Sequence, residues 1–391
     1  MPGAEAEGIA PAGAPTSAPP RAPKRLLLLG GGHVHLSLLK ALATRPVHGW
    51  SVQLVTPFPR FIYSGMLPGW VAGEWSLDDC TISLPALAVR AHVALHETAA
   101  IALDLTLNEV VSADGRRRRF DLLSIDTGPQ AALVGLPGAA EHALTVRPIE
   151  RFMTAWPQVV ERWRTSAARF ELLVVGDGAA AVELAFSIRA RARREGASQV
   201  RVSLLGGEAL PLPGAAPQLR RHLLTLLRKR GVHWHGDGIV TQVLAGSVVR
   251  ERGAALAFDV CIAATGTAAP RWPGEAGLAT DERGFIRVDR SLRSTSHPQV
   301  FAAGDVAAYA DARPKSGVFA VRAGPVLADN IRAACAGQPL REWCPPQRVL
   351  SLIGTGNQDA IAAWGRFSAS GHWAWRWKNH IDKCFVQSFS S

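Results

Sequence analysis

The stretch KRLLLLGGGHVHLSLLK, residues 24–40, decides the fold of this chain. A short apolar run ends in three glycines and passes directly into a sequence with helical spacing, which is the order of a strand, a turn and a helix. Gly30 suits the tight turn, and Gly32 lets backbone N–H groups approach a pyrophosphate at the helix N-terminus. His33, at the start of the expected helix, is a further candidate contact. His35 holds the third small position of the motif, so the stretch needs support from the rest of the chain.

A second unit of this kind follows at residues 170–185, FELLVVGDGAAAVELA. A β-rich run leads into Gly176 and Gly178, and Ala181 fills the third small position at the start of a helix. One unit binds one dinucleotide, so two units predict two nucleotides that meet.

A repeated strand supports two similar domains. FDLLSIDTG at residues 120–128 is matched by FDVCIAATG at residues 258–266, and each is an apolar strand that ends in Thr-Gly. We expect Thr127 and Gly128 to pass close to the first nucleotide, and Gly266 to pass close to the second.

The ribose ends of both sites lack the expected carboxylate. Thr56 stands at the end of the second strand of the first unit, where a hydroxyl can still hydrogen-bond a ribose without charge assistance. In the second unit, Gly206 and Gly207 occupy the place of the acidic residue that selects NADH, and Glu208 comes slightly later. The choice between NADH and NADPH therefore stays open.

Residues 300–303 form a short apolar strand that is followed by Gly304 and Asp305. This places Asp305 at the ligand edge of a sheet, where it can accept hydrogen bonds from the polyol of a flavin, or else N-cap the next segment. Lys315 stands with small residues at the start of a helix. Its ammonium group and the helix N-terminus favour an anion such as a reduced flavin.

Composition narrows the class of protein. The 391 residues predict two or three domains, and the net charge of +11 comes largely from arginine runs without a nucleic-acid recognition motif, so we expect no nucleic-acid partner. Residues 1–23 read as a disordered leader and not as a signal peptide. The cysteines form no CxxC pair, which argues for a reducing, cytoplasmic location and against a disulfide framework or a metal cluster. They are Cys80, Cys261, Cys335, Cys344 and Cys384.

Two further segments have apolar faces. FIYSGMLPG, residues 61–69, predicts a loop that lies against a flat ring system. Tyr63 and Met66 are its candidate residues on the acceptor side, where a second substrate would take electrons from the ring system. Residues 370–389 predict a helix that rests on the cytoplasmic face of a membrane, on a partner, or on the body of the protein. Its apolar face is made of Trp373, Trp377, Ile381, Cys384 and Phe385, with Arg376, Lys378 and Lys383 elsewhere.

In this order, GGGH, FDLLSIDTG, GDGAAAVELA, CIAATG and FAAGD resemble the flavoproteins of the pyridine nucleotide-disulfide oxidoreductase superfamily. YSGMLPG, PKSGVFAVRAGPVLADNI and the ending SLIGTGNQ…WRWKNHID are similar to a narrower family related to type II NADH dehydrogenases, found alone or fused ahead of selenide, water dikinase. The resemblance implies an α/β fold with two Rossmann-like domains, the second inserted in the first. The expected parts are FAD-binding residues 24–145 and 267–340, NAD(P)H-binding residues 146–266, and a C-terminal interface region, 341–391.

The resemblance also implies site residues. Gly30 and Gly32 would face the FAD pyrophosphate, and Asp305 would bind the ribityl chain. Glu183 matches the Glu of a GVELA motif that lies near the nicotinamide. The residues expected beside the pyrimidine end of the isoalloxazine are Lys315, Ser316, Gly317 and Val318.

Departures from the family pattern bear on the electron acceptor. A redox-active cysteine pair beside the flavin is absent, which argues against a disulfide reductase, and the cysteines fit a sulfide:quinone reductase poorly. Val318 and Arg322 stand where type II NADH dehydrogenases carry glutamines that meet the quinone, which argues against a quinone acceptor.

We therefore expect an FAD-dependent oxidoreductase in which NADH or NADPH passes hydride to flavin N5 and electrons then go to an unidentified small acceptor. Lys315, Glu183 and Tyr63 are its candidate catalytic residues. One alternative is a sulfide- or polysulfide:quinone oxidoreductase. Another is an FAD-bound partner or sensor in selenium metabolism that docks selenide, water dikinase through its tail.

Overall fold

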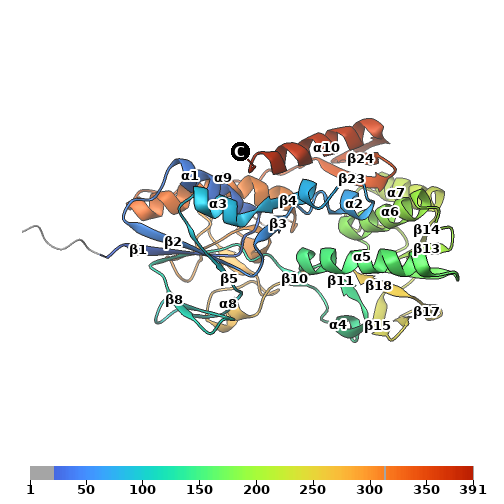
Figure 1. Ribbon diagram of the computed structural model, residues 1–391, viewed down its shortest axis with the longest axis horizontal. Coiled ribbons are helices and arrows are strands. Elements are labelled where there is room, and N and C mark those ends of the chain that lie inside the picture. The colour runs from blue at the N-terminus through green and yellow to red at the C-terminus, as the bar shows by residue number, and fades with distance from the viewer. Residues whose placement is uncertain (1–21, 312–313, 391) are drawn as a thin grey trace, which may run out of the picture.

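The computed structural model describes residues 22–311 and 314–390. It shows an α/β chain in which two five-stranded parallel sheets lie side by side along the long axis of the molecule (Figure 1). The α/β prediction is confirmed. Most of the leader predicted for residues 1–23 lies outside the described residues.

The first sheet has the order β21-β9-β1-β2-β5, and all its strands are parallel. Its central strand β1 (Lys24–Leu29) is apolar and buried from Leu26 onward, as expected for a strand covered on both faces. The other strands are β2 (Trp50–Thr56), β5 (Ala94–Glu97), β9 (Leu122–Ile125) and β21 (Val300–Ala302). Because β21 comes from the far end of the chain, the second domain is inserted in the first.

Helices cover one face of this sheet (Figure 1). The helix α1 (His33–Thr44) packs along α9 (Gly317–Ala336), with α3 (Leu84–Arg90) beside them. A Cβ at Gly324 of α9 would lie 2.4 Å from Ser37 Oγ, so glycine is what lets the two helices approach. The opposite face carries β6 (Ala100–Asp104), β7 (Glu109–Ser112), β8 (Arg117–Arg119), α8 (Trp272–Glu275), β20 (Ile286–Val288) and β22 (Ala307–Tyr309).

The second domain repeats the plan with the sheet order β11-β18-β12-β13-β14. Its strands are β11 (Leu144–Thr145), β12 (Phe170–Val175), β13 (Val200–Leu205), β14 (Val232–His235) and β18 (Val260–Ala263). Its helices are α4 (Ala139–His142), α5 (Ile149–Thr165), α6 (Ala179–Arg194) and α7 (Pro217–Arg230). A small antiparallel sheet adds β15 (Val240–Leu244), β16 (Ser247–Arg250) and β17 (Leu256–Ala257).

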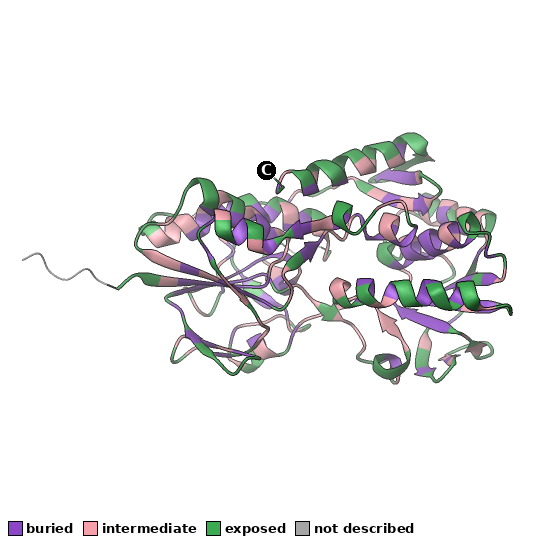
Figure 2. Cartoon of the chain, viewed as in Figure 1, coloured by how far each residue is buried: buried purple, intermediate pink, exposed green. Residues whose placement is uncertain are grey.

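The C-terminal region spans both domains. A three-stranded antiparallel sheet packs on α6 and leads into the helix α10 (His372–Gln387), which runs along the upper edge of the molecule (Figure 1). Its strands are β23 (Ser351–Gly356), β24 (Asp359–Trp364) and β25 (Phe367–Gly371). Figure 2 shows exposed residues along the outer side of α10.

Short elements complete the fold. Between the domains β10 (Gln130–Ala131) pairs antiparallel with β19 (Thr267–Ala268). Beneath α10 lie β3 (Arg60–Ile62), α2 (Leu67–Val71), η1 (Asp78–Cys80) and β4 (Thr81–Ser83), and η2 (Gly304–Val306) follows β21.

Two local predictions were wrong. The sequence of residues 141–164 predicts a largely helical segment that Pro157 interrupts. In the structure Leu144 and Thr145 pair with β18, and Pro148 precedes a new helix, α5, that continues through Pro157. The segment 61–69 is not a plain loop, since it starts in β3 and ends in α2. Met66 is buried in the core of the first domain and does not line the acceptor side.

Candidate active site

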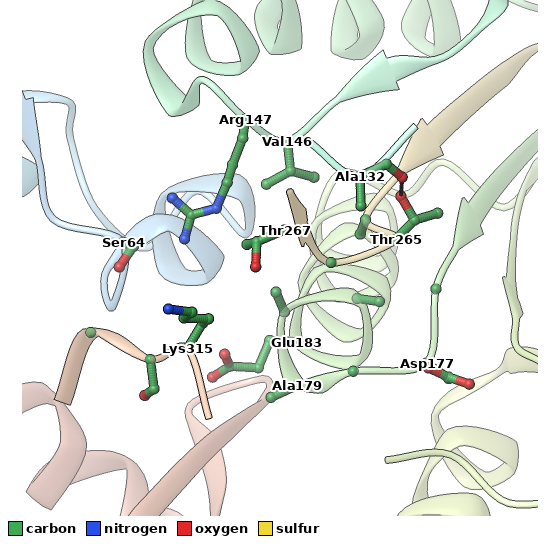
Figure 3. Close-up of a pocket in the computed structure, with 18 of the residues that line it drawn as sticks. Ser64, Ala132, Val146, Arg147, Asp177, Ala179, Glu183, Thr265, Thr267 and Lys315 are labelled. Carbon is green, nitrogen blue, oxygen red and sulfur yellow. Dashed lines mark hydrogen bonds between the residues drawn. The ribbon is translucent and has the colours of Figure 1, made fainter. Parts of the chain in front are cut away.

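A cavity of about 1150 Å³ opens where the two domains and α10 meet. The first domain contributes residues around the α1 and α9 N-termini, and the second contributes the glycine turn before α6. Figure 3 shows Arg147, Lys315 and Glu183 pointing into the same space from three different segments. The cavity also receives side chains from α10, namely Trp377, Lys378, Ile381, Asp382 and Phe385.

The first glycine turn fits a pyrophosphate. Gly30 has φ +86°, and a Cβ there would lie 2.4 Å from the Asp126 carbonyl oxygen, so no other residue is accommodated. Gly32 is the N-cap of α1, and its carbonyl accepts the first helical hydrogen bond from Leu36. Thr127 Cα lies 2.5 Å from the same hypothetical Cβ on Gly30, so Thr127 packs against the turn. A close backbone cradle at a helix N-terminus is what a dinucleotide pyrophosphate requires.

His35 is buried under this turn and not exposed. Its Nδ1 lies 2.6 Å from the Gly30 carbonyl oxygen and its Nε2 lies 2.8 Å from Ser124 Oγ on β9. Burial lowers the pKa of His35 to about 4, so the ring is neutral. The imidazole therefore faces the sheet. The hydrogen bond between His35 and Ser124 stands where a small residue would otherwise let the helix pack closely on the strand.

Asp126 was not predicted from the sequence. It directly follows β9, it is 3% exposed, and its Oδ2 accepts the N–H groups of Val34 (2.8 Å) and His35 (2.9 Å) at the N-terminus of α1. Burial and, to a smaller extent, the charge of Asp305 raise the pKa of Asp126 to about 8, although the two backbone hydrogen bonds oppose the rise. The repeat carried a signal for it, because Asp126 stands where the second copy has Ala264.

Asp305 lies in η2 at the carboxyl edge of the first sheet, as the sequence predicted. Its Oδ2 lies 3.6 Å from Nη2 of Arg147, and it accepts a hydrogen bond from the backbone of Ser316. Burial raises the pKa of Asp305, and the charges of Arg147 and Lys315 oppose that rise. Arg147 was missed because it lies between two elements of the second domain and carries no motif.

Lys315 lines the cavity just before α9, together with Ser316, Gly317 and Val318. Its ammonium group donates to the Ala307 carbonyl and lies 3.9 Å from the centre of the Phe285 ring. Burial lowers the pKa of Lys315 to about 8, although Asp305 favours its charged form. These contacts hold a cation beside the place predicted for the pyrimidine end of the flavin.

Replacing Lys315 by Met is expected to lower the flavin reduction potential and to slow flavin reduction by roughly tenfold, because a cation near the developing anion is lost. The measurements are a spectroscopic redox titration and rapid-mixing kinetics. Lys229→Met on α7 is the control. Unchanged potential and unchanged kinetics in Lys315→Met would remove this role.

The second glycine turn has the same construction. Gly176 has φ +136°, and a Cβ there would lie 2.3 Å from the Ala264 carbonyl oxygen. Ala181 is fully buried, as close helix-to-strand packing requires. Thr265 donates to the Ala132 carbonyl (2.6 Å; Figure 3), and Thr265, Gly266 and Gly178 all line the cavity.

Other candidates lie apart from the cavity lining. Thr56 is 4% exposed and donates to the Phe58 carbonyl at 3.4 Å, and Gly128 has φ +70° after β9. Their predicted contacts with the nucleotide stay predictions. Glu208 pairs with Arg220 at 2.6 Å beyond the end of β13, so an acidic and a basic group both stand near the expected ribose end.

Glu183, Tyr63 and two residues of α10 form a polar cluster. Glu183 Oε1 accepts the Gly354 N–H at 2.7 Å, and burial raises its pKa while Lys378 opposes the rise. Lys378 Nζ donates to Asp382 Oδ2 (2.7 Å) and to the Gly65 carbonyl (2.5 Å). Tyr63 faces Asp382, and its pKa is raised by burial and by that carboxylate. The sequence pattern predicted that Lys378 lies off the apolar face of this helix, whereas in the structure its side chain points into the protein toward Asp382 and Gly65.

His33 lies at the centre of an aromatic group in the cavity. Its ring centre is 4.7 Å from that of Phe61 and 5.8 Å from that of Tyr63, and Phe385 stacks on Tyr63 at 4.5 Å. Burial and the charge of Arg147 lower the pKa of His33 to about 4. Nε2 is buried without a hydrogen-bond partner among the described residues. It is therefore free to bond a cofactor or substrate.

All five cysteines belong to the described part of the chain, and none lines this cavity. Burial raises the pKa of Cys80, Cys261 and Cys335 to about 12, so these thiols are not nucleophiles near neutral pH.

Residues 24–324 match the family described as pyridine nucleotide-disulphide oxidoreductase. The chain belongs to this family. Its predicted cofactors, FAD and NAD(P)H, are those of the family, and the chain is an FAD-dependent NAD(P)H oxidoreductase. The expected superfamily is confirmed.

Known relatives fit this assignment. The demethylphylloquinone reductase of Synechocystis is 24% identical, with 86% of each chain covered. The sulfide:quinone oxidoreductase of Aquifex aeolicus shares the fold at a TM-score of 0.78 and 18% identity, with 94% of this chain and 91% of that chain covered. The Plasmodium falciparum NDH2 solved with NADH has a TM-score of 0.77 at 13% identity, with 93% and 98% covered.

Proposed function

We propose that this enzyme passes electrons from NAD(P)H through FAD to a flat, apolar acceptor of the quinone class. When bound, FAD accepts a hydride from the nicotinamide and returns the electrons to a second substrate. The glycine turn before α6 supports entry of NAD(P)H from the second domain. The acceptor would enter from the side that α10 closes.

One observation carries this proposal: the C-terminal helix supplies an aromatic and apolar wall to the cavity. Phe385 stacks on Tyr63, while Trp377 and Ile381 line the cavity and stay 45% and 41% exposed. Exposed large apolar side chains at the entrance of a cavity suit an apolar ligand. Val318 and Val321 of α9 add to this apolar wall, and Arg322 lies beside them, so a valine and an arginine line the cavity at the two places where the family resemblance puts glutamines.

Reduction of a quinone consumes two protons, and the polar cluster of Glu183, Lys378, Asp382 and Tyr63 lies at the acceptor side. Burial raises the pKa of the Glu183 carboxyl, and the pKa of the neighbouring Lys378 ammonium is raised as well, so both groups favour their protonated forms. We propose that this cluster supplies protons to the acceptor. The alternative in which sulfide donates the electrons is disfavoured, because none of the five cysteines lines the cavity.

The outer face of α10 fits a membrane surface, where a quinone is dissolved. Trp373 is 50% exposed beside Trp377 and Ile381, and Arg376 and Lys383 supply positive charge. No helix in the described part of the chain has the length and apolar content needed to cross a bilayer. We propose that α10 rests on an anionic membrane, and docking of selenide, water dikinase on this helix stays a prediction.

Phe385→Ala is expected to raise the KM for a short-chain quinone by roughly tenfold and to leave flavin reduction by NAD(P)H unchanged, because only the acceptor side loses its stacking wall. Steady-state kinetics and single-turnover flavin reduction give the two values. Phe367→Ala, on the exposed side of the C-terminal sheet, is the matched control. An unchanged KM in Phe385→Ala would contradict the assignment of this wall.

A further inference from the structure

The two dinucleotide sites of this chain differ beneath their glycine turns. Both copies have the same backbone bonds: Gly30 N–H donates to Val55 and Gly176 N–H to Leu205, while the residue after each closing strand donates to the end of the central strand. At three matched positions beneath the turn, a polar side chain in the first copy replaces an apolar one in the second. His35, Ser124 and Asp126 of the FAD site stand where the NAD(P)H site has Ala181, Ile262 and Ala264.

These three polar residues form one network under the FAD turn. His35 bonds Gly30 and Ser124 through its ring, and its backbone N–H donates to Asp126 Oδ2. Asp126 thereby accepts hydrogen bonds from the N–H groups of Val34 and His35 in the first turn of α1. In the second site Ala264 holds the matching position and offers the first turn of α6 no carboxylate. The backbone N–H groups left for a pyrophosphate in the first site are those before Val34.

The second carboxyl oxygen of Asp126 points between the two FAD motifs. A Cβ on Gly304 would lie 2.4 Å from Oδ1, and a Cβ on Gly32 would lie 2.6 Å from both oxygens. The carboxyl group is thus held between the glycine turn and the Gly304–Asp305 turn, where the pyrophosphate and the ribityl chain are expected.

The charges around Asp126 favour a neutral acid. From α1 it faces His35, which is neutral, and from the segment after β21 it faces Asp305 and Tyr309. The nearby cations, Arg147 and Lys315, act on Asp305. When two carboxyl groups lie close together and nearby cations stabilise the charged form of only one, the other carboxyl group keeps its proton. A dianionic pyrophosphate at the same turn adds repulsion to any charge on Asp126.

We propose that Asp126 binds FAD as a neutral carboxylic acid: Oδ2 accepts the two α1 N–H groups, and a proton on Oδ1 is donated to an oxygen of FAD. FAD binding is therefore linked to proton uptake from solvent at this residue. The inference rests on FAD as the cofactor and is independent of the acceptor. It assigns Asp126 as a specificity residue that distinguishes the FAD site from the NAD(P)H site of the same chain.

The linkage has a definite sign. Without FAD the pKa of Asp126 is already raised to about 8, and the bound anion raises it further. FAD affinity is then fully present below pH 8 and falls as the pH rises toward the bound-state pKa, by up to roughly tenfold per pH unit.

The test is FAD release from the holoenzyme after dilution, followed by flavin fluorescence between pH 6.5 and pH 9.5. Wild type is expected to release FAD faster above pH 8. Asp126→Asn keeps both hydrogen-bonding roles without a titrating proton, so its release should be slow and independent of pH. Asp121→Asn, an exposed carboxylate at the start of the same strand, should keep the wild-type profile.

Two outcomes would overturn the proposal. One is a wild-type release rate that does not change with pH. The other is an Asp126→Asn variant that folds, as judged by circular dichroism, but releases FAD faster than wild type at every pH, since this would mean that the site needs a charged carboxylate. Asp126→Ala, which copies Ala264 of the second site, should lose the pH dependence and bind FAD more weakly.

Discussion

Gly176→Ala is expected to abolish reduction of the flavin by NAD(P)H at ordinary nucleotide concentrations while FAD stays bound. Gly176 has φ +136°, where an L side chain is strained, and its Cβ would lie 2.3 Å from the Ala264 carbonyl oxygen. That oxygen belongs to backbone at the end of a buried strand and cannot yield. The turn must open, and we expect the Kd for NAD(P)H to rise by roughly hundredfold or more.

The neighbouring glycine provides the control for this prediction. A Cβ on Gly178 meets no atom within 4 Å, and its φ of −74° is open to any residue. Gly178→Ala should therefore fold normally and change the Kd much less in the absence of direct crowding by the nucleotide. Anaerobic titration of the flavin absorbance with NADH and NADPH measures both variants. Equal Kd values for Gly176→Ala and wild type would show that this turn does not bind the nicotinamide nucleotide.

Lys378→Met is expected to slow reoxidation of the reduced flavin by a quinone by roughly hundredfold, because proton supply and acceptor positioning are lost together. Although burial lowers it, Asp382 and Glu183 raise the pKa of Lys378 above its ordinary value. Removal of this cation leaves the carboxyl groups of Glu183 and Asp382 near each other without a neutralising charge between them. We also expect a loss of about 3 kcal/mol in the free energy of unfolding of the C-terminal region.

The control for this variant lies on the same helix. Lys383→Met removes a cation from the other side of α10, where Nζ lies 4.4 Å from the Trp75 ring centre. Stopped-flow reoxidation and thermal unfolding measure both variants, and Lys383→Met should change reoxidation little. If Lys378→Met is reoxidised at the wild-type rate, the cluster does not serve the acceptor.

The two glycine turns and the repeated strands could be predicted because their signals are local. Gly30 and Gly176 are required by backbone conformation and close approach, which any residue with a Cβ would violate. The same holds for Asp305, since its place at the end of a short buried strand fixes the sheet edge that it occupies.

The acceptor side could not be predicted in the same way, because it is assembled by tertiary packing. The pattern of α10 showed an apolar face, but not that Phe385 stacks on Tyr63 or that Lys378 turns inward to Asp382. Arg147 likewise reaches Asp305 only through the packing of the two domains. Asp126 was different, because the repeated strands already showed an aspartate where the second copy has Ala264. Its role could be inferred only from the hydrogen bonds that it accepts from the α1 N–H groups.

The most direct test of the central claim is anaerobic reduction of the purified flavoprotein by NADH or NADPH, followed by addition of a short-chain quinone. We predict that a nicotinamide nucleotide bleaches the visible flavin absorbance and that the quinone restores it. Bleaching by sulfide alone, or reduced flavin that a quinone fails to reoxidise, would contradict the proposed acceptor and the role given to α10.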